Sequence, residues 1–112
     1  VAVVLGGAAV GATAYLVGTQ IWLETHMPDG VIPTSREQLA LVLWNAAGKP
    51  QPASTALYAD LSAEAVDSQL AARWCVEQGL LKDYGESFKP GDYTFRPQVI
   101  KAWNQVQQMI NQ

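Results

Sequence analysis

Apolar positions divide the chain into a continuous leader and a longer region in which they recur at helical spacing. Residues 1–23 contain no charged side chain, and the first acidic residue is Glu24. This length is close to the ~20 residues with which a helix crosses a bilayer. Trp22 stands at the end of the run, where an amphipathic ring suits a lipid–water interface. The pattern predicts an N-terminal apolar helix over residues 1–24.

Three interpretations of this leader remain open. A transmembrane or signal-anchor helix is the one we favour, and Gly7 and Gly11 form a small-xxx-small pair through which another membrane helix could approach. A cleavable signal peptide is the second, because residues 12–14 have the small-x-small pattern of such cleavage sites. The third is a helix buried against the rest of the protein.

A linker and a first amphipathic helix follow the leader. Residues 25–34 contain a Pro-Asp-Gly turn and a further proline, which predict an extended linker. Ser35, with Gln38 three residues later, forms a capping box that begins a helix. Gly48 marks its end. Its apolar stripe consists of Leu39, Leu43 and Ala46.

Two more helices are predicted towards the C-terminus. The first begins near Ser62 or Asp67, ends at Gly79 and carries one face made of Val66, Leu70, Trp74 and Gln78. The second begins near Arg96, with Pro97 in its first turn. Its stripe is Val99, Trp103, Val106 and Ile110.

Between these helices, Leu80-Leu81 and residues 93–95 could pair as two very short strands. The fold class is therefore all-α. We expect an apolar helix followed by a small three-helix domain over residues 35–112, with at most a very short two-stranded β element.

Composition narrows the functions that this domain could have. The chain has 112 residues and a formal net charge of -3, and its Lys and Arg residues are scattered along the sequence. A duplex nucleic-acid partner requires a concentrated basic face, so we do not expect one. Cys75 is the only cysteine and His26 the only histidine. Neither has a partner at catalytic or metal-ligand spacing, so we expect no enzyme, no metal and no cofactor.

Five sequence elements occur in the order that is typical of the S-layer homology module, a helical unit of bacterial surface proteins. The two helix starts are each similar to the family's Thr-Arg-Ala-Glu motif, and the other three are similar to its aromatic-x-Asp, Ala-x-x-x-Gly and Phe-x-Pro elements. They are residues 35–38, 95–98, 58–61, 71–81 and 88–90. The resemblance covers roughly residues 33–110, as one repeat preceded by the opening helix of another.

The resemblance implies a non-enzymatic protein of the bacterial cell envelope, membrane-anchored or secreted with the domain outside. Its module would attach to, or organise, the wall layer through an anionic polysaccharide. The binding residues that it implies are Arg36, Arg96, Trp44, Trp74 and Lys82. Family members usually carry three repeats, so a homo-oligomer is compatible with this single one.

Each of these residues also has a structural alternative. The arginines could pair with local acids or pack on a ring, and the tryptophans could belong to the core. The glutamates of the family's helix-start motif are replaced by Gln38 and Gln98. The alternative function is therefore a membrane-tethered protein–protein interaction or scaffold module without a polymer ligand.

Overall fold

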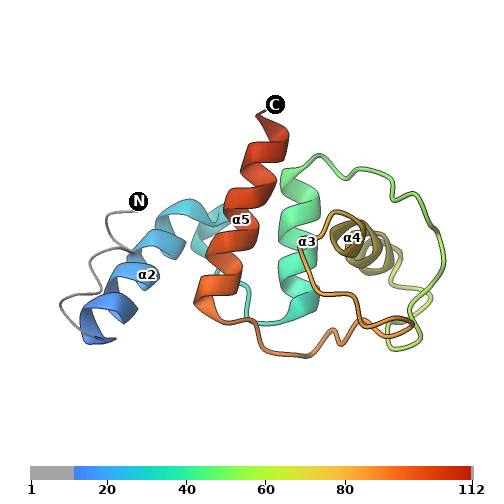
Figure 1. Cartoon of the computed structure of the whole chain (residues 1–112), viewed down its shortest axis with the longest axis horizontal. Coiled ribbons are helices and arrows are strands. Elements are labelled where there is room, and N and C mark those ends of the chain that lie inside the picture. Colours follow the sequence, from blue (N-terminus) through green and yellow to red (C-terminus); the bar gives the residue numbers. More distant parts are fainter. Residues whose placement is uncertain (1–11, 112) are drawn as a thin grey trace. The chain divides into compact units, whose positions relative to one another are not determined.

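The computed structural model describes residues 12–111, and the chain divides into two units, Val1–Ile32 and Pro33–Gln112. The first unit contains α2 (Ala12–His26) and the short 3-10 helix η2 (Pro28–Gly30). The second contains α3 (Arg36–Ala46), α4 (Val66–Glu77) and α5 (Arg96–Ile110). Figure 1 shows these elements along the chain. The prediction of a mostly helical protein is confirmed.

In the first unit, α2 continues beyond the predicted end of the apolar run. The ring of Trp22 stacks on that of His26 with 4.1 Å between centroids, and Nδ1 of His26 lies 2.8 Å from the Trp22 carbonyl oxygen. Residues 25 and 26 belong to this helix, whereas the sequence predicted that the linker begins at residue 25. Beyond them, η2 occupies the predicted Pro-Asp-Gly turn.

The predicted membrane helix lies only partly within the described residues. Across residues 12–111, no helix combines the length and the apolar character that crossing a membrane requires. Gly7 and Gly11, which we predicted to pack against another membrane helix, lie outside the described residues.

In the second unit, α3 packs against both α4 and α5 (Figure 1). Its N-terminus forms the Ser35 half of the predicted capping box, whereas Gln38 bonds to residue 34 and not to residue 35. The Ser35 side chain accepts a hydrogen bond from the Gln38 N–H at 3.2 Å, and the Gln38 side chain accepts one from the Thr34 N–H at 2.9 Å. At the other end, Gly48 adopts a φ of 87°, a left-handed conformation that suits glycine.

The buried face of α4 differs from the predicted one. Val66 is 59% exposed, although the sequence placed it on the apolar face. Trp74 is buried as predicted, and the other buried residues of this helix are Ser68, Gln69, Ala71, Ala72 and Cys75. Small side chains at this interface allow α3 and α4 to approach closely, and the Cys75 thiol lies 3.6 Å from the Ala40 carbonyl oxygen.

The predicted pairing between Leu80-Leu81 and residues 93–95 is wrong. An isolated antiparallel bridge joins Tyr93 to Ser35 instead. The Thr94 N–H donates to the Thr34 carbonyl oxygen at 3.0 Å, and the Arg36 N–H donates to that of Asp92, also at 3.0 Å. These bonds hold the first turn of α3 beside the segment that leads into α5. The two copies of the helix-start motif therefore lie next to each other.

The apolar stripe of α5 faces the rest of this unit over only part of its length. Val99 and Val106 are fully buried, whereas Trp103 is half-buried and Ile110 is 44% exposed. The C-terminal end of α5 extends beyond α3 in Figure 1.

Side chains of all three helices and of the loop between α4 and α5 form the core, which includes Leu39, Leu43, Trp44, Ala71, Trp74, Phe88, Val99 and Val106.

Candidate functional site

Arg36 is buried at the start of α3 and holds the loop between α4 and α5. It is only 5% exposed. Its Nε donates to the Phe88 carbonyl oxygen and its Nη2 to that of Lys82, both at 2.8 Å. The guanidinium carbon lies 4.8 Å from the ring centroid of Tyr84 and 4.6 Å from that of Phe88. Burial lowers the pKa of Arg36 below its usual value. The resemblance implied that Arg36 contacts a ligand, but its side chain instead stabilises the loop between α4 and α5.

Asp60, in the segment before α4, fixes the same loop through its backbone. Its carboxylate oxygens accept the N–H groups of Phe88 and Lys89, each at 2.8 Å. Partial desolvation opposes ionisation of this carboxyl, but these backbone donors outweigh it and lower its pKa. The Asp of the aromatic-x-Asp element therefore sets the position of Phe88 and Lys89.

Buried polar contacts also fix the segment before α4. The Gln69 amide accepts from the Tyr58 N–H at 2.8 Å and donates to three carbonyl oxygens, those of Tyr58, Leu61 and Ser62. The Tyr58 ring packs against Phe88 with 5.4 Å between centroids, and the Arg73 guanidinium lies 3.9 Å from the Tyr58 centroid. Residues 58–62 and 82–90 are thus fixed by interior contacts.

Trp44 and Trp74 belong to the core, which was the alternative interpretation of these rings. Trp44 is 3% exposed and its indole N–H donates to the Pro50 carbonyl oxygen at 2.8 Å. Trp74 is 6% exposed. Neither ring is accessible for stacking on a sugar.

The other two predicted binding residues are more exposed. Arg96 begins α5 and is half-buried, and Lys82 is exposed.

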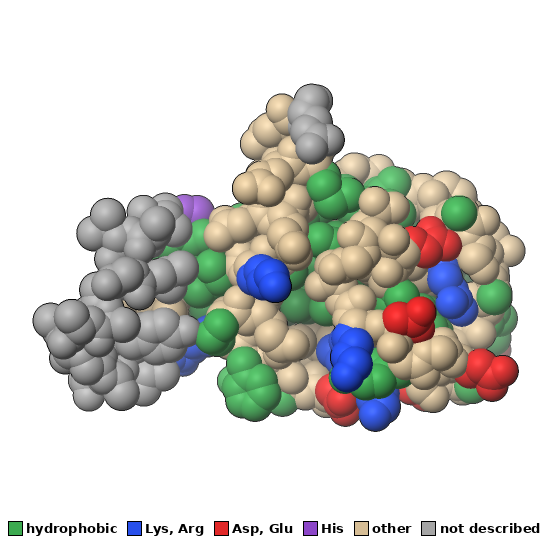
Figure 2. Space-filling view, in the orientation of Figure 1, with side chains coloured by type: hydrophobic (Ala, Val, Ile, Leu, Met, Phe, Trp, Pro, Cys, Tyr) green, Lys and Arg blue, Asp and Glu red, His purple; other side chains and the backbone are tan. Residues whose placement is uncertain are grey.

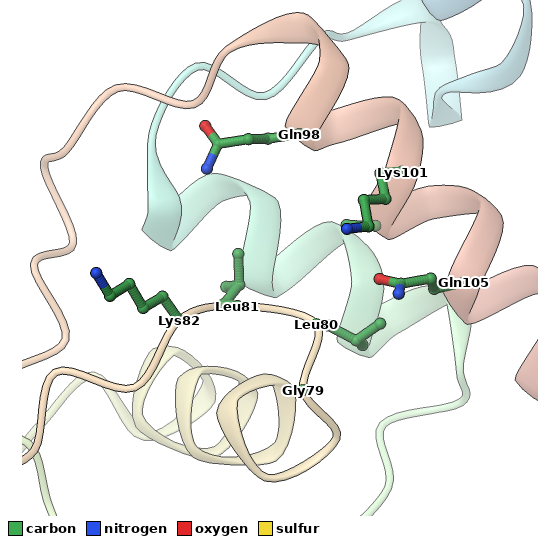
Figure 3. A pocket seen from close by; sticks show the side chains of 8 residues that line it. Gly79, Leu80, Leu81, Lys82, Gln98, Lys101 and Gln105 are labelled. Carbon is green, nitrogen blue, oxygen red and sulfur yellow. The ribbon is translucent and has the colours of Figure 1, made fainter.

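A groove of about 180 Å³ lies between the segment 79–82 and one face of α5 (Figure 3). Gln98, Lys101 and Gln105 extend from α5 towards this segment, which contributes Leu80, Leu81 and Lys82. Of the predicted binding residues, only Lys82 lines this groove. The spacing of residues 98, 101 and 105 puts them on one helix face, which is the sequence signal that could have indicated the other wall.

Two lysines lie close to the ring of Tyr84, and one of them, Lys82, also lines the groove. The ammonium of Lys89 lies 4.4 Å from the Tyr84 ring centroid, and that of Lys82 lies 5.2 Å from it. Within residues 12–111, Lys82, Lys89 and Lys101 form no ion pair. On the face drawn in Figure 2, two of the Lys or Arg side chains lie close together and the others are separated by neutral and acidic surface, so that no broad basic field is formed.

Comparisons with known proteins identify no relative of this chain. No family model, curated protein or solved structure matches it.

Proposed function

We propose that this chain is a non-enzymatic protein of the bacterial cell envelope, whose domain attaches to an anionic wall polysaccharide in the manner of an S-layer homology module. One observation carries the proposal. The groove beside α5 contains two ammonium groups, Lys82 and Lys101, which have no carboxylate partner among residues 12–111, together with two primary amides. In a chain with a net charge of -3, such a site suits a negatively charged ligand.

The lining of the groove matches the chemistry of an acidic sugar. Lysine ammonium groups attract a carboxylate, and this attraction is stronger beside protein than in bulk water. The amides of Gln98 and Gln105 offer both donors and acceptors to sugar hydroxyls. Leu80 and Leu81 also line the groove but are only 9% and 8% exposed, so the lysines and amides would make most of the contact with a sugar.

The size of the groove favours one unit of a polymer over a free small molecule. Its volume of about 180 Å³ is below the ~300 Å³ at which pockets for drug-sized ligands begin. A shallow site of this size encloses too little surface to bind one sugar tightly. A polymer that offers the same unit many times compensates through repeated rebinding, and several copies of the chain would increase the effect. A leader that anchors or exports the protein would place the domain beside the wall.

A protein–protein interaction module remains the second candidate function, and one observation favours it. Tyr93 and Phe95 are 58% and 63% exposed, and their rings meet edge to face with 4.9 Å between centroids. Exposed aromatic pairs are frequent at protein interfaces. The lysines of the groove would then contact an acidic partner protein or nothing at all.

Co-sedimentation of the full chain with purified bacterial walls distinguishes the two functions. We expect binding to intact walls, and loss of binding once the secondary polysaccharide has been removed. The Lys82→Gln/Lys101→Gln variant should bind several-fold less, whereas Lys49→Gln should bind as the wild type does, because Lys49 lies against Trp44 and away from the groove lining. Absence of binding to intact walls contradicts the proposal and favours the interaction module.

A further inference from the structure

We infer that the groove is one end of a longer anion-binding track, and that its ligand is a polysaccharide segment with at least two negative groups. The track consists of Lys101, Lys82 and Lys89, with the Tyr84 ring between the last two. This inference rests on the proposed function, because it names the length and the charge of the ligand that the same site takes.

Lys82 makes the track continuous. It lines the groove opposite Lys101 of α5 (Figure 3). Its ammonium also lies 5.2 Å from the Tyr84 centroid, while the Lys89 ammonium lies 4.4 Å from the same point. Positive groups therefore follow one another from α5 across the segment 79–82 to residue 89. A ligand that carried one charge would occupy only part of this surface.

Arg36 holds the middle of the track in place. Its guanidinium lies 4.8 Å from the Tyr84 centroid and bonds the carbonyl oxygens of Lys82 and Phe88. One buried side chain thus fixes the backbone before and after the Tyr84 turn. Because the loop is fixed before any ligand arrives, binding costs less conformational entropy than it would with a mobile loop.

The backbone of Lys89 adopts a conformation that its own side chain disfavours. Its φ is 60°, in the left-handed region where glycine is the usual residue, and the following Pro90 restricts it further. The Asp60 carboxylate accepts the Lys89 N–H at 2.8 Å, and the Lys89 carbonyl oxygen accepts the Asp92 N–H at 3.1 Å. These bonds fix the point from which the Lys89 side chain extends towards the Tyr84 ring.

The carboxylates of the same loops leave these lysines available. The Asp60 oxygens are bonded to the backbone at residues 88 and 89, and Asp83 Oδ1 accepts the Gly85 N–H at 2.8 Å. Glu86 and Asp92 form no ion pair with Lys82 or Lys89 in the described structure. In the described structure, the lysines of the track therefore form no ion pair with these carboxylates.

The test uses acidic oligosaccharides released from bacterial walls and separated by ion exchange into singly and multiply charged fractions. We would titrate each fraction into the full chain and into two variants, Lys89→Gln and Lys89→Gly. Loss of one charge contact should weaken binding of the multiply charged fraction about five- to tenfold and leave the singly charged fraction unchanged. Lys89→Gly should show the same loss with equal or higher thermal stability, because glycine adopts the left-handed backbone freely.

Lys49 provides a matched control. It also has a left-handed backbone, with φ 58°, precedes a proline and lies near an aromatic ring, Trp44, at 5.9 Å. Lys49→Gln and Lys49→Gly should leave binding of both fractions unchanged. If both fractions bind with equal affinity and the Lys89 variants match the wild type, the extended track is overturned while the proposed function stands. If neither fraction binds, both are overturned.

Discussion

Arg36 is a charged side chain that stabilises the interior of this small domain. The sequence offers it as a ligand contact at a helix start, yet its guanidinium is enclosed between Tyr84 and Phe88 and donates to two main-chain carbonyls. Charge-assisted bonds to backbone oxygens are stronger than neutral ones. They fix the loop between α4 and α5, whose own backbone forms an isolated bridge between Tyr84 and Ser87.

Arg36→Ala should destabilise the domain strongly. The change removes two hydrogen bonds, leaves the Phe88 and Lys82 carbonyl oxygens without their donor and opens a gap between two rings. We expect a loss of about 3 kcal/mol in the free energy of unfolding, measured by chemical denaturation. Lys101→Ala, at an exposed position, should change stability by less than about 0.5 kcal/mol. Equal stabilities of the two variants would contradict this role of Arg36.

Cys75 should be unreactive in the folded protein. Burial raises the pKa of its thiol from the ordinary value of 9.0 to about 12. A thiol-specific reagent at pH 8 should therefore label the native chain slowly and the denatured chain at once. Because the folded pKa is the higher one, the protonated thiol favours the folded state below pH 9, and this contribution is lost as the pH rises towards 12. Rapid labelling of the native chain would show that Cys75 is accessible.

At the scale of elements, the two helix starts are similar in sequence but differ in how they are capped. The Ser35 hydroxyl caps α3, whereas Phe95 at the start of α5 has no side-chain acceptor to offer. The Gln98 amide instead accepts the Phe95 N–H at 3.0 Å. The start of α3 is also tied to the chain before α5 by backbone bonds, so the stability of the two helices is linked.

Ser35→Ala should lower the free energy of unfolding by about 1 kcal/mol, the usual value of an N-cap hydroxyl. The Gln38 N–H would lose its acceptor at 3.2 Å while the backbone bridge to Tyr93 remained. Thr55→Ala, at an exposed loop position, is the control and should be neutral. Thermal denaturation followed by circular dichroism measures both. A neutral result for Ser35→Ala would mean that the backbone bridge alone fixes this helix start.

The stability of the domain should depend on pH through the Asp60 carboxyl, which fixes the loop between α4 and α5. Desolvation opposes the shift, but the N–H groups of Phe88 and Lys89 lower the folded pKa of this carboxyl. Its contribution to stability is therefore complete above the unfolded pKa and is lost as the pH falls through the lower folded value. Wild-type stability should fall on acidification below about pH 4. Asp60→Asn should be less stable at neutral pH and should lose less on acidification, which urea titrations at several pH values would show.

The ends of these helices could be predicted from the sequence. The residues that they contact far away in the chain could not. Ser35, Gly48 and Pro97 indicated helix ends because caps and prolines act on neighbouring residues. The carbonyl oxygens that Arg36 bonds lie 46 and 52 residues away in the chain, beyond any local pattern. The face of α4 was misplaced because its buried polar residues Ser68 and Gln69 bond to Glu37 and to the 58–62 segment, and no periodicity of apolar residues marks them.

At the scale of the whole molecule, the described chain comprises one unit with α2 and η2 and a second unit in which α3 packs against α4 and α5. The lysines of the track stand on α5 and on the loop that precedes it, and this loop is fixed by Arg36 and Asp60 from distant parts of the sequence. Folding of the domain therefore assembles the binding surface. A polymer that contacts several such sites would bind firmly even if each site is weak.

The most direct test of this account is calorimetric titration of the released acidic wall polysaccharide into the full chain. We predict that it binds, that affinity falls as salt is raised, and that Lys82→Gln/Lys101→Gln lowers affinity about tenfold or more while Lys49→Gln does not. Thermal denaturation of the same samples would confirm that the variants are folded. A polysaccharide that fails to bind the wild type, or that binds the double variant equally well, would contradict the central claim.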